Sequence, residues 1–424
     1  MIRPTPLWRS VAVLGVAGLV LTACGGDDGD TTAEPKDNAS SSAPAAKGDG
    51  TLKIGTLLPQ TGSLAFLGPP EFAGVDLAVQ DINDAGGVNG KPVAVTHSDS
   101  GDTSTDTASQ SVDRLLSNDV DAIIGAASSS VSLSVIDKIV AAGVLEISPA
   151  NTSDELTKYD DKGLYFRTAP PDVLQGRVLG DLILADGNST VGILALQDSY
   201  GTGLADSTTQ SITDGGGEVV ETVVYDPKAA SFSTEVGKIK AADPEAIAVI
   251  AFDETKKIIP ELVKQGIGPD AKKIYFVDGN LAGYDKDFPK GTLEGVKGTL
   301  PGVAATDEFK ARLTDLKPEL TEFAYAPESY DATILVALAA TASGDDSGES
   351  IASAMQDVST GGTKCTSYQE CVDLLGNDED IDYDGVSGPV EFNDAGDPSE
   401  ATIGIYQYGA DNTYSFVEGK AGKI

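Results

Sequence analysis

The stretch that decides the fold is DAIIGAASSSVSLSVIDKIVAAGVLEISPANT, residues 121–152. It opens with a short apolar run at Asp121–Ala126, and three serines follow at the expected start of a helix. Val131–Val140 carries apolar residues at helical spacing, and Val144–Ile147 is a short apolar segment typical of a buried strand. The order strand, serine-rich turn, helix and strand predicts a βαβ unit with two parallel strands.

Two polar turns end the strands of this stretch, at residues 128–130 and 148–152. Parallel strands deliver the turns at their carboxyl ends to one edge of the sheet, where open α/β sheets bind small ligands. Free backbone N–H groups at a helix start favour an anion, and small hydroxyl side chains add donors. The turns therefore predict a cradle for a carboxylate, although simple capping of the helix would explain the same serines.

The N-terminus has the features of a secretion signal. Arg3 and Arg9 precede an apolar run at Val11–Leu21. The small-residue segment Leu-Thr-Ala (21–23) comes directly before Cys24. The apolar run is short for a membrane-spanning helix. Residues 1–23 resemble a bacterial lipoprotein signal peptide with its lipobox. The resemblance implies cleavage before Cys24, lipidation of its sulfur and an extracytoplasmic protein anchored to the cell membrane; an uncleaved anchor helix is the alternative.

Residues 24–50 are expected to form a flexible tether, because Gly, Ser, Ala, Thr, Asp and Pro dominate them. The whole chain of 424 residues has a formal net charge of −37. Such acidity argues against a nucleic-acid partner and against binding through an anionic lipid surface. The chain that follows the tether exceeds one ordinary hydrophobic core, which suggests two lobes.

From Thr51 onward, apolar strands alternate with amphipathic helices, and the alternation restarts after Tyr165–Thr168. Strands separated by helices of this length indicate parallel βαβ units. The pattern assigns no element to residues 169–190. The strands expected after the restart are 191–196, 219–225, 246–252 and 273–277.

Six segments resemble, in the same order, the type I solute-binding proteins of ABC transporters, specifically their branched-chain amino-acid-binding (leucine/isoleucine/valine) family. The segments are KIGTLLPQTGSLAFLG (53–68), DINDAGGVNGKPV (81–93), ISPANTSDELT (147–157), LQDSYGTGLA (196–205), ESYDATILVALAA (328–340) and SGPVEFNDAGD (387–397). Together they cover nearly all of residues 51–410.

The resemblance implies an α/β protein of two Rossmann-like lobes, with parallel sheets flanked by helices and a hinge of three crossovers. It places the first lobe in residues 51–169 and 299–395, and the second in residues 170–298 and 396–424. It implies a small amino acid, branched-chain or hydrophobic by preference, that is trapped between the lobes and delivered to the transmembrane subunits of an ABC permease. We expect no catalysis and no cofactor.

The same resemblance assigns a head-group site. Ser129 matches the serine that takes the ligand's carboxylate through its hydroxyl and backbone N–H. Ala150 and Thr152 match positions that hold the carboxylate and the ammonium. Asp278 falls where the family has an acidic partner for the ammonium, here in the sequence FVDG instead of a turn that bears glutamate.

The remaining candidate ligand-binding residues are Tyr200, Phe66, Phe252, Ala127 and Ser128. Tyr200 matches an aromatic residue from the second lobe, and Phe66 matches one that lines the side-chain pocket. Phe252 stands where the family has a tyrosine that binds the carboxylate. Ala127 is small and precedes Ser128, so the pocket is expected to be roomier than one fitted to leucine.

Cys365 and Cys371 remain after the lipobox cysteine. In an exported protein, two such cysteines predict a disulfide.

One acidic segment matches the spacing of an EF-hand calcium loop: Asp380, Asp382, Asp384 and Gly385, followed by Glu391. The residues that come after Gly385 read as a strand and no helix pair is expected around the segment. A solvated acidic turn is therefore favoured, with calcium binding as the alternative and no metal ligand assigned.

The sequence gives little support for an enzymatic function. His97 is the only histidine, at the end of an expected strand, and no G-x-S-x-G elbow occurs. Two other functions stay open beside transport. One is a sensor of the same fold that signals to a membrane partner when it binds amino acids, amides or other small polar solutes. The other is an enzyme that acts on small amides or esters.

Overall fold

The computed structural model describes residues 48–424. The expected signal peptide, Cys24 and nearly all of the expected tether lie outside these residues. Within the described residues no helix has the length and apolar character needed to cross a membrane.

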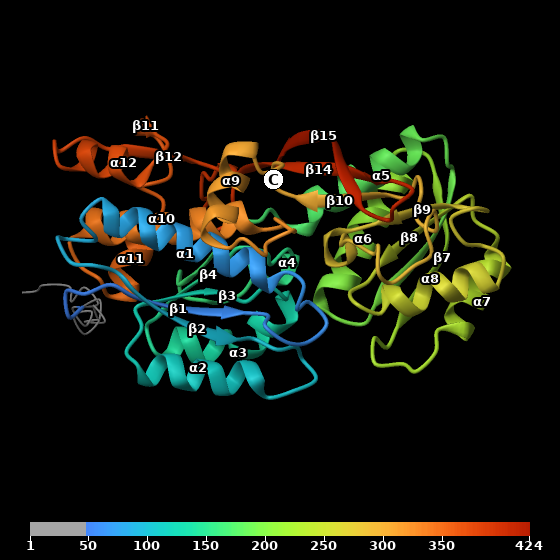
Figure 1. The fold of residues 1–424 in the computed structure, drawn as a ribbon, viewed down its shortest axis with the longest axis horizontal. Coiled ribbons are helices and arrows are strands. Elements are labelled where there is room, and N and C mark those ends of the chain that lie inside the picture. The colour runs from blue at the N-terminus through green and yellow to red at the C-terminus, as the bar shows by residue number, and fades with distance from the viewer. Residues whose placement is uncertain (1–47) are drawn as a thin grey trace, which may run out of the picture. The chain divides into compact units, whose positions relative to one another are not determined.

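The first sheet has five parallel strands in the order β2-β1-β3-β4-β5 (Figure 1). Its strands are β1 Lys53–Leu58, β2 Ala94–Asp99, β3 Ala122–Gly125, β4 Leu145–Ser148 and β5 Tyr165–Arg167. The helices that alternate with them are α1 Gly68–Asp84, α2 Thr107–Ser117, α3 Ser129–Ala141 and α4 Asp154–Thr157. The βαβ unit predicted from residues 121–152 is therefore confirmed as β3-α3-β4.

The second sheet has seven strands in the order β15-β14-β10-β9-β8-β6-β7, and β14 and β15 are antiparallel to their neighbours. Its strands are β6 Thr190–Leu196, β7 Glu218–Tyr225, β8 Ala246–Ile250, β9 Lys273–Phe276, β10 Lys297–Pro301, β14 Glu400–Tyr408 and β15 Tyr414–Lys423. Its helices are α5 Asp172–Ala185, α6 Ser199–Asp214, α7 Ser233–Ala242, α8 Thr255–Lys264 and the single 3-10 turn η1 Asp278–Asn280.

The chain between β10 and β14 returns to the first sheet. Helix α10, Ala326–Ser343, lies along α1 (Figure 1) and shares a hydrophobic cluster with α1, β3 and β4. The other elements of this part are α9 Asp307–Leu316, α11 Gly348–Ala354, β11 Thr363–Cys365, α12 Tyr368–Leu375, β12 Ile381–Gly385 and β13 Gly388–Pro389.

The chain thus passes from one sheet to the other three times, after β5, after β10 and before β14. This arrangement confirms the α/β fold of two Rossmann-like lobes joined by three crossovers. The strands of the first sheet lie in residues 53–167, and those of the second lie in 190–301 and 400–423. The lobe limits given above from the resemblance stay a prediction.

Helix α5 was not expected from the sequence. Gly176 and Gly180 lower its helix propensity and interrupt its apolar pattern. Their role is close packing against α6: a Cβ on Gly176 would lie 2.6 Å from Cβ of Ser207, and one on Gly180 would lie 2.5 Å from Oγ of Ser211. This helix therefore depends on its tertiary contact with α6, which the local sequence does not reveal.

The disulfide between Cys365 and Cys371 is confirmed. It joins β11 to α12, close to the acidic segment that resembles a calcium loop. That segment forms strand β12, and the ammonium of Lys364 lies 3.1 Å from Asp382 and 3.0 Å from Asp384. Lysine thus neutralises part of the acidic segment, and among the described residues no group of three or more potential ligands is placed to hold a metal ion.

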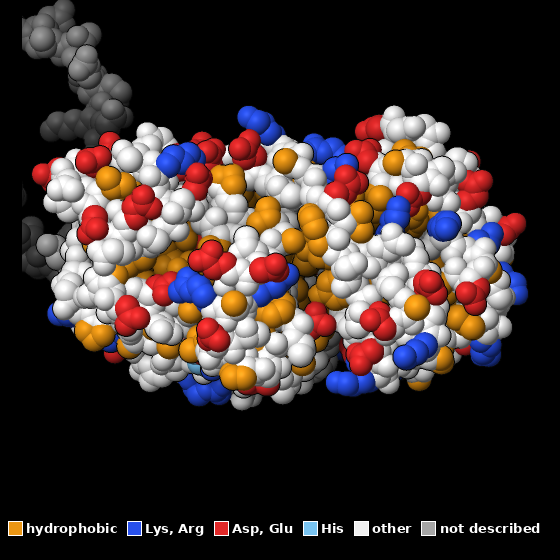
Figure 2. Space-filling view, turned by 45° about the horizontal axis from the view of Figure 1, so that its top comes forward, with side chains coloured by type: hydrophobic (Ala, Val, Ile, Leu, Met, Phe, Trp, Pro, Cys, Tyr) orange, Lys and Arg blue, Asp and Glu red, His pale blue; other side chains and the backbone are white. Residues whose placement is uncertain are grey.

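The visible face in Figure 2 carries acidic and basic side chains that are intermingled, with hydrophobic side chains exposed mainly in hollows near its middle. On that face no continuous basic patch forms, in keeping with the net charge of −37.

A fully buried ion pair links the first crossover to the third. Nε of Arg167 lies 2.6 Å from Oδ1 of Asp397, and both side chains are 0% exposed. The guanidinium also donates to the carbonyl of Ser153 and to Oγ1 of Thr157, which in turn donates to Asp397. Hydrogen bonds therefore surround both charges, which is the condition for burying an ion pair without a large net cost.

Replacing Asp397 by alanine is expected to lower the free energy of unfolding by about 3–5 kcal/mol, because it leaves a buried guanidinium without a counter-charge. Urea denaturation of the wild type and Asp397→Ala measures this loss. Asp394→Ala, at an exposed acid in the same loop, is the control and should change the free energy of unfolding by no more than about 0.5 kcal/mol. Equal losses in both variants would contradict the role given to the ion pair.

Candidate functional site

The two polar turns of the first sheet are joined directly. Ser128 is the N-cap residue of α3, and Oγ of Ser129 accepts hydrogen bonds from the backbone N–H groups of Thr152 and Ser153, each at 3.2 Å. The side chain of Asn151 donates to the carbonyls of Ala126 and Ala127, at 2.9 Å each. The expectation that both turns share one sheet edge is therefore confirmed.

Three predicted residues of the second sheet face this edge. Tyr200 lies in the first turn of α6, Phe252 follows β8, and Asp278 opens η1 directly after β9. The rings of Tyr200 and Phe252 are stacked, with centroids 5.5 Å apart and planes at 11°. The hydroxyl of Tyr200 donates to Oδ1 of Asp278 at 2.7 Å.

A small cavity lies between the two edges, with a volume of about 10 Å³. Space of this size holds roughly one water molecule. The cavity is lined by Leu64, Leu67, Ala127, Ser128, Ser129, Ala150, Thr152, Tyr200, Phe252, Asp278, Gly279 and Tyr325. All the ligand-binding residues expected from the resemblance therefore come together here, with the exception of Phe66.

Phe66 is the residue that the structure places elsewhere. Consecutive turns run through residues 62–67, with hydrogen bonds from the N–H of Ala65 to the carbonyl of Gly62 and from the N–H of Leu67 to the carbonyl of Leu64. Leu64 and Leu67 are three residues apart and point to the cavity, whereas Phe66 is half-buried and packs against the core of the second lobe. The loop that contains Phe66 thus borders the cavity through Leu64 and Leu67, and a role of Phe66 in ligand binding stays a prediction.

Asp278 is the electrostatic centre of the cavity. Its Oδ1 accepts hydrogen bonds from Tyr200 and from Nε2 of Gln175 at 2.8 Å, and its Oδ2 accepts one from the hydroxyl of Tyr325 at 2.8 Å. Burial raises the pKa of Asp278, and the three side-chain hydrogen bonds act in the opposite direction. Three neutral donors surround this carboxylate, and among the described residues it forms no ion pair.

Sequence reasoning missed a second buried acid, Asp172, at the start of α5. Its backbone N–H donates to the carbonyl of Thr152 at 2.7 Å, but neither carboxylate oxygen has a hydrogen-bond partner among the described residues. Oγ1 of Thr152 and Oε1 of Gln175 are also without partners there. Burial, followed by the charge of Asp278, raises the pKa of Asp172 well above its usual range. Acceptors thus outnumber donors next to the cavity, which suits a cationic donor.

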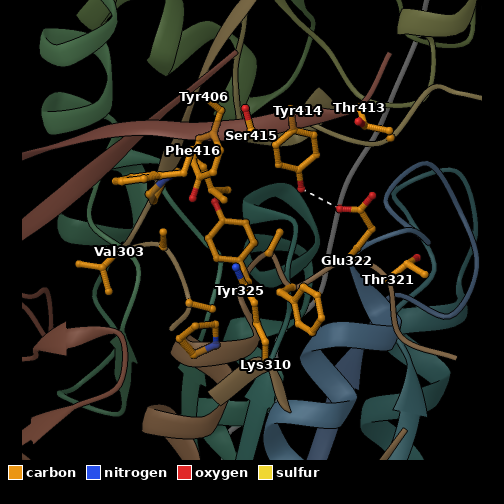
Figure 3. Close-up of a pocket in the computed structure, with 18 of the residues that line it drawn as sticks. Val303, Lys310, Thr321, Glu322, Tyr325, Tyr406, Thr413, Tyr414, Ser415 and Phe416 are labelled. Carbon is orange, nitrogen blue, oxygen red and sulfur yellow. Dashed lines mark hydrogen bonds between the residues drawn. The ribbon is translucent and has the colours of Figure 1, made fainter. Parts of the chain in front are cut away.

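A larger cavity of about 580 Å³ adjoins the site on the other side of Tyr325 (Figure 3). Figure 3 shows the hydroxyl of Tyr414 directed at Glu322, to which it donates at 2.8 Å. Tyr325 lines both cavities, so its ring forms a wall between them. No ligand-binding residue expected from the resemblance lines this larger cavity.

The unpaired burial of Asp172 predicts a pH effect on stability. A carboxyl whose pKa is higher in the folded than in the unfolded protein stabilises the fold at low pH, and that stability is lost as the pH rises toward the folded pKa. Asp172→Asn removes this loss. The free energy of unfolding of the variant, relative to wild type, should therefore increase from pH 4 to pH 8.

Denaturant titrations at several pH values, without added ligand, measure this difference. Asp181→Asn, at an exposed acid of the same helix, is the matched control and should follow the wild type at every pH. A difference between Asp172→Asn and wild type that stays constant with pH would contradict the prediction.

Comparison with known proteins agrees with this architecture. A family model described as periplasmic binding protein matches residues 51–366. The Leu/Ile/Val-binding protein homolog 1 of Brucella suis is 26% identical over 380 residues, which cover 86% of this chain and 93% of that protein. The chemotactic signal transduction system substrate-binding protein BasB of Halobacterium salinarum is 27% identical over 363 residues, which cover 82% and 84%.

Among solved structures, the branched-chain amino acid transporter substrate binding protein LivJ from Streptococcus pneumoniae, in complex with isoleucine, matches with a TM-score of 0.70. The match covers 88% of this chain and 100% of that one at 23% sequence identity, so it supports the fold alone. The family model spans most of the chain, from the first strand of the first sheet to the disulfide region. The chain therefore belongs to the periplasmic binding protein family.

Proposed function

We propose that this protein is an extracytoplasmic substrate-binding protein of an ABC importer, which binds an α-amino acid between its lobes and presents it to the permease. One observation carries the proposal. A sheet edge rich in N–H and hydroxyl groups, at Ser129 and Thr152, faces the buried carboxylate of Asp278 across one small cavity. Donors on one side and an acid on the other are complementary to a zwitterion.

The carboxylate of the ligand would lie at the start of α3, beside Ser129 and the turn that contains Ala150 and Thr152. The helix dipole and the first backbone N–H groups of α3 favour a negative group there. The ammonium would lie toward Asp278, with the unpartnered oxygens of Asp172 and Thr152 as further acceptors. The three N–H groups of the ammonium would then give a donor to some of these unsatisfied acceptors.

The side chain of the ligand would contact Leu64, Leu67, Ala127 and Phe252. These apolar walls support a branched-chain or hydrophobic group next to the head group. The names of relatives point the same way, since the Brucella suis protein is a Leu/Ile/Val-binding homolog.

Binding would require the lobes to separate and close again, because the cavity between them is no larger than about one water molecule. The hydrogen bond from Tyr325 to Asp278 joins a residue next to α10 of the first lobe to a residue of the second. Closure would shield the head group from water and give the permease a distinct shape to recognise.

Sensing is a second candidate function, and one comparison favours it. BasB of Halobacterium salinarum is described as a substrate-binding protein of a chemotactic signal transduction system. A sensor and an importer would bind the ligand in the same way, and they would differ in the membrane partner. Cross-linking in membranes, with amino-acid uptake measured in a deletion strain, separates them: unchanged uptake would favour sensing.

An enzymatic function has no support in the site. His97 lies within β2, not at its end, where Thr56 and Asp76 hold its two ring nitrogens at 2.9 Å each. Relatives matched over most of the chain are solute-binding proteins. A structural role for this histidine therefore accounts for its contacts.

Ser129→Ala and Asp278→Ala are each expected to weaken amino-acid binding by about tenfold or more, because each removes a hydrogen-bonding partner of a charged group. Isothermal titration calorimetry with leucine, isoleucine and valine measures the loss. Ser134→Ala is the control, since Ser134 lies on the same helix and donates to the carbonyl of Val131, outside the cavity. Unchanged affinity in both site variants, with folded protein shown by thermal unfolding, would refute the assignment.

We also propose that Cys24 carries a lipid that holds the protein at the membrane, on the evidence of the lipobox-like sequence at residues 21–24. Cys24→Ala should abolish labelling by radioactive palmitate and release the protein from the membrane fraction. Labelling that persists in the variant, or wild-type protein that is never labelled, would contradict the proposal.

A further inference from the structure

The cavity of about 580 Å³ shown in Figure 3 is large enough to hold a small organic molecule, and the proposed amino-acid site does not use it. Its walls come from both lobes. The first lobe contributes most of residues 321–328, at the start of α10 and just before it. The second lobe contributes residues of β14, of β15 and of the turn that joins them. A molecule in this cavity would therefore contact both lobes.

Aromatic rings form one corner of the cavity. The ring of Tyr406 lies at 80° to that of Tyr414 and at 71° to that of Phe416, with centroids 5.5 Å apart in each pair. Tyr325 and Phe323 line the same cavity, and Figure 3 shows how the labelled rings gather around it. The faces of aromatic rings are electron-rich and attract cations, so these walls favour a positively charged ligand.

One of these rings already has a cation beside it. Nζ of Lys310 lies 5.8 Å from the centroid of the Phe323 ring, within the range of about 6 Å that is typical of a cation–π contact. Two further charged residues on the walls, Asp285 and Lys286, are exposed and opposite in sign. The aromatic wall thus accepts a positive group, and the remaining charges on the walls are those of two glutamates.

Glu328 is the residue that points to a missing cation. It lines the cavity and is 2% exposed, and its Oε1 has no hydrogen-bond partner among the described residues. This oxygen lies against the backbone of Gly302, where a Cβ would collide with it. Gly302 stands between Pro301 and Val303, which both line the cavity. The carboxyl group therefore lies at the cavity wall, beside the second crossover.

The electrostatics of the cavity agree with this placement. Burial raises the pKa of Tyr406, and the charge of Glu328 raises it further. Burial also raises the pKa of Glu328 well above its usual range, and the charge of Asp331 adds to the rise. Glu322 differs, because it already accepts a hydrogen bond from Tyr414. Burying a carboxylate without a partner is costly, and a cation in the cavity would supply the counter-charge that Glu328 lacks.

We propose that this cavity is a second ligand site, for a small organic cation of the quaternary ammonium class. Such an ion has no N–H group to donate, and it is bound by aromatic faces and one counter-charge. The rings of Tyr325, Tyr406 and Phe416 surround its methyl groups, and Glu328 supplies the negative charge. This site is separate from the amino-acid site and does not rest on the proposed function.

Isothermal titration calorimetry with choline and with its neutral isostere 3,3-dimethyl-1-butanol tests the proposal on the purified protein. Choline is expected to bind at least about tenfold more tightly than the isostere, because it alone carries a charge for the rings and for Glu328. Glu328→Gln keeps the shape of the side chain and should remove this advantage. Glu418→Gln is the control, at an acid of β15 that is 49% exposed and lies outside the cavity, and should change neither affinity.

Phe416 gives a second test at a position where the side chain is 47% exposed, so that the fold tolerates a change. Phe416→Leu should weaken choline binding by several-fold, and Phe416→Tyr, which keeps the ring, should retain it. A purely structural role of the residue would not separate these two variants. Thermal unfolding of each variant checks the fold.

A further variant distinguishes the two sites. Ser129→Ala, which is expected to weaken amino-acid binding, should leave choline affinity within about twofold, since Ser129 does not line the larger cavity. Choline that binds no more tightly than its isostere, or that is insensitive to both Glu328→Gln and Phe416→Leu, would overturn the inference. Loss of choline binding in Ser129→Ala would also overturn it, because choline would then occupy the amino-acid cavity.

Discussion

The rest of the site depends on the carboxylate of Asp278, which is buried between the lobes without a cation. Its three side-chain donors come from α5, from α6 and from Tyr325, which immediately precedes α10. Asn280 holds the turn in place by accepting from the N–H of Val277 and donating to the carbonyl of Val249. Neutral donors moderate a buried negative charge but do not neutralise it. A positive group in the cleft would therefore be stabilised before any contact with the side-chain pocket.

Through Tyr325, the carboxylate of Asp278 also takes part in the contact between the two lobes. Its backbone has positive φ, at 59°, and its hydroxyl reaches Asp278 from the chain that leads into α10. The residue thus connects the two lobes at the wall between the small cavity and the larger one of Figure 3. An ammonium that approaches Asp278 competes directly with this hydroxyl. One hydrogen bond between Tyr325 and Asp278 therefore joins the two lobes at this wall.

The sequence predicts the fold well because the fold depends on repeated local patterns. The strands and helices of residues 121–152 follow from apolar spacing and serine placement, and the parallel order then brings Ser129 and Thr152 to one edge. Helix α5 escaped prediction because its glycines serve a contact with α6 that no local pattern reveals. Asp172 was not predicted either, because it lies at the start of that helix.

Side-chain direction within loops is harder to predict than the loop itself. Phe66 was expected at the cavity, whereas turns through residues 62–67 direct Leu64 and Leu67 there. The direction of a side chain within a loop thus depends on tertiary packing, which a linear pattern does not encode.

The order of strands in the second sheet has a consequence for biogenesis. Sheet one is complete once residue 167 has been made, but β10 stays an open edge until β14 and β15 arrive from residues 400–423. An unpaired strand edge is a template for wrong pairing between chains. Residues 400–423 therefore close the vulnerable edge, so removing them would leave β10 unpaired and expose the chain to aggregation.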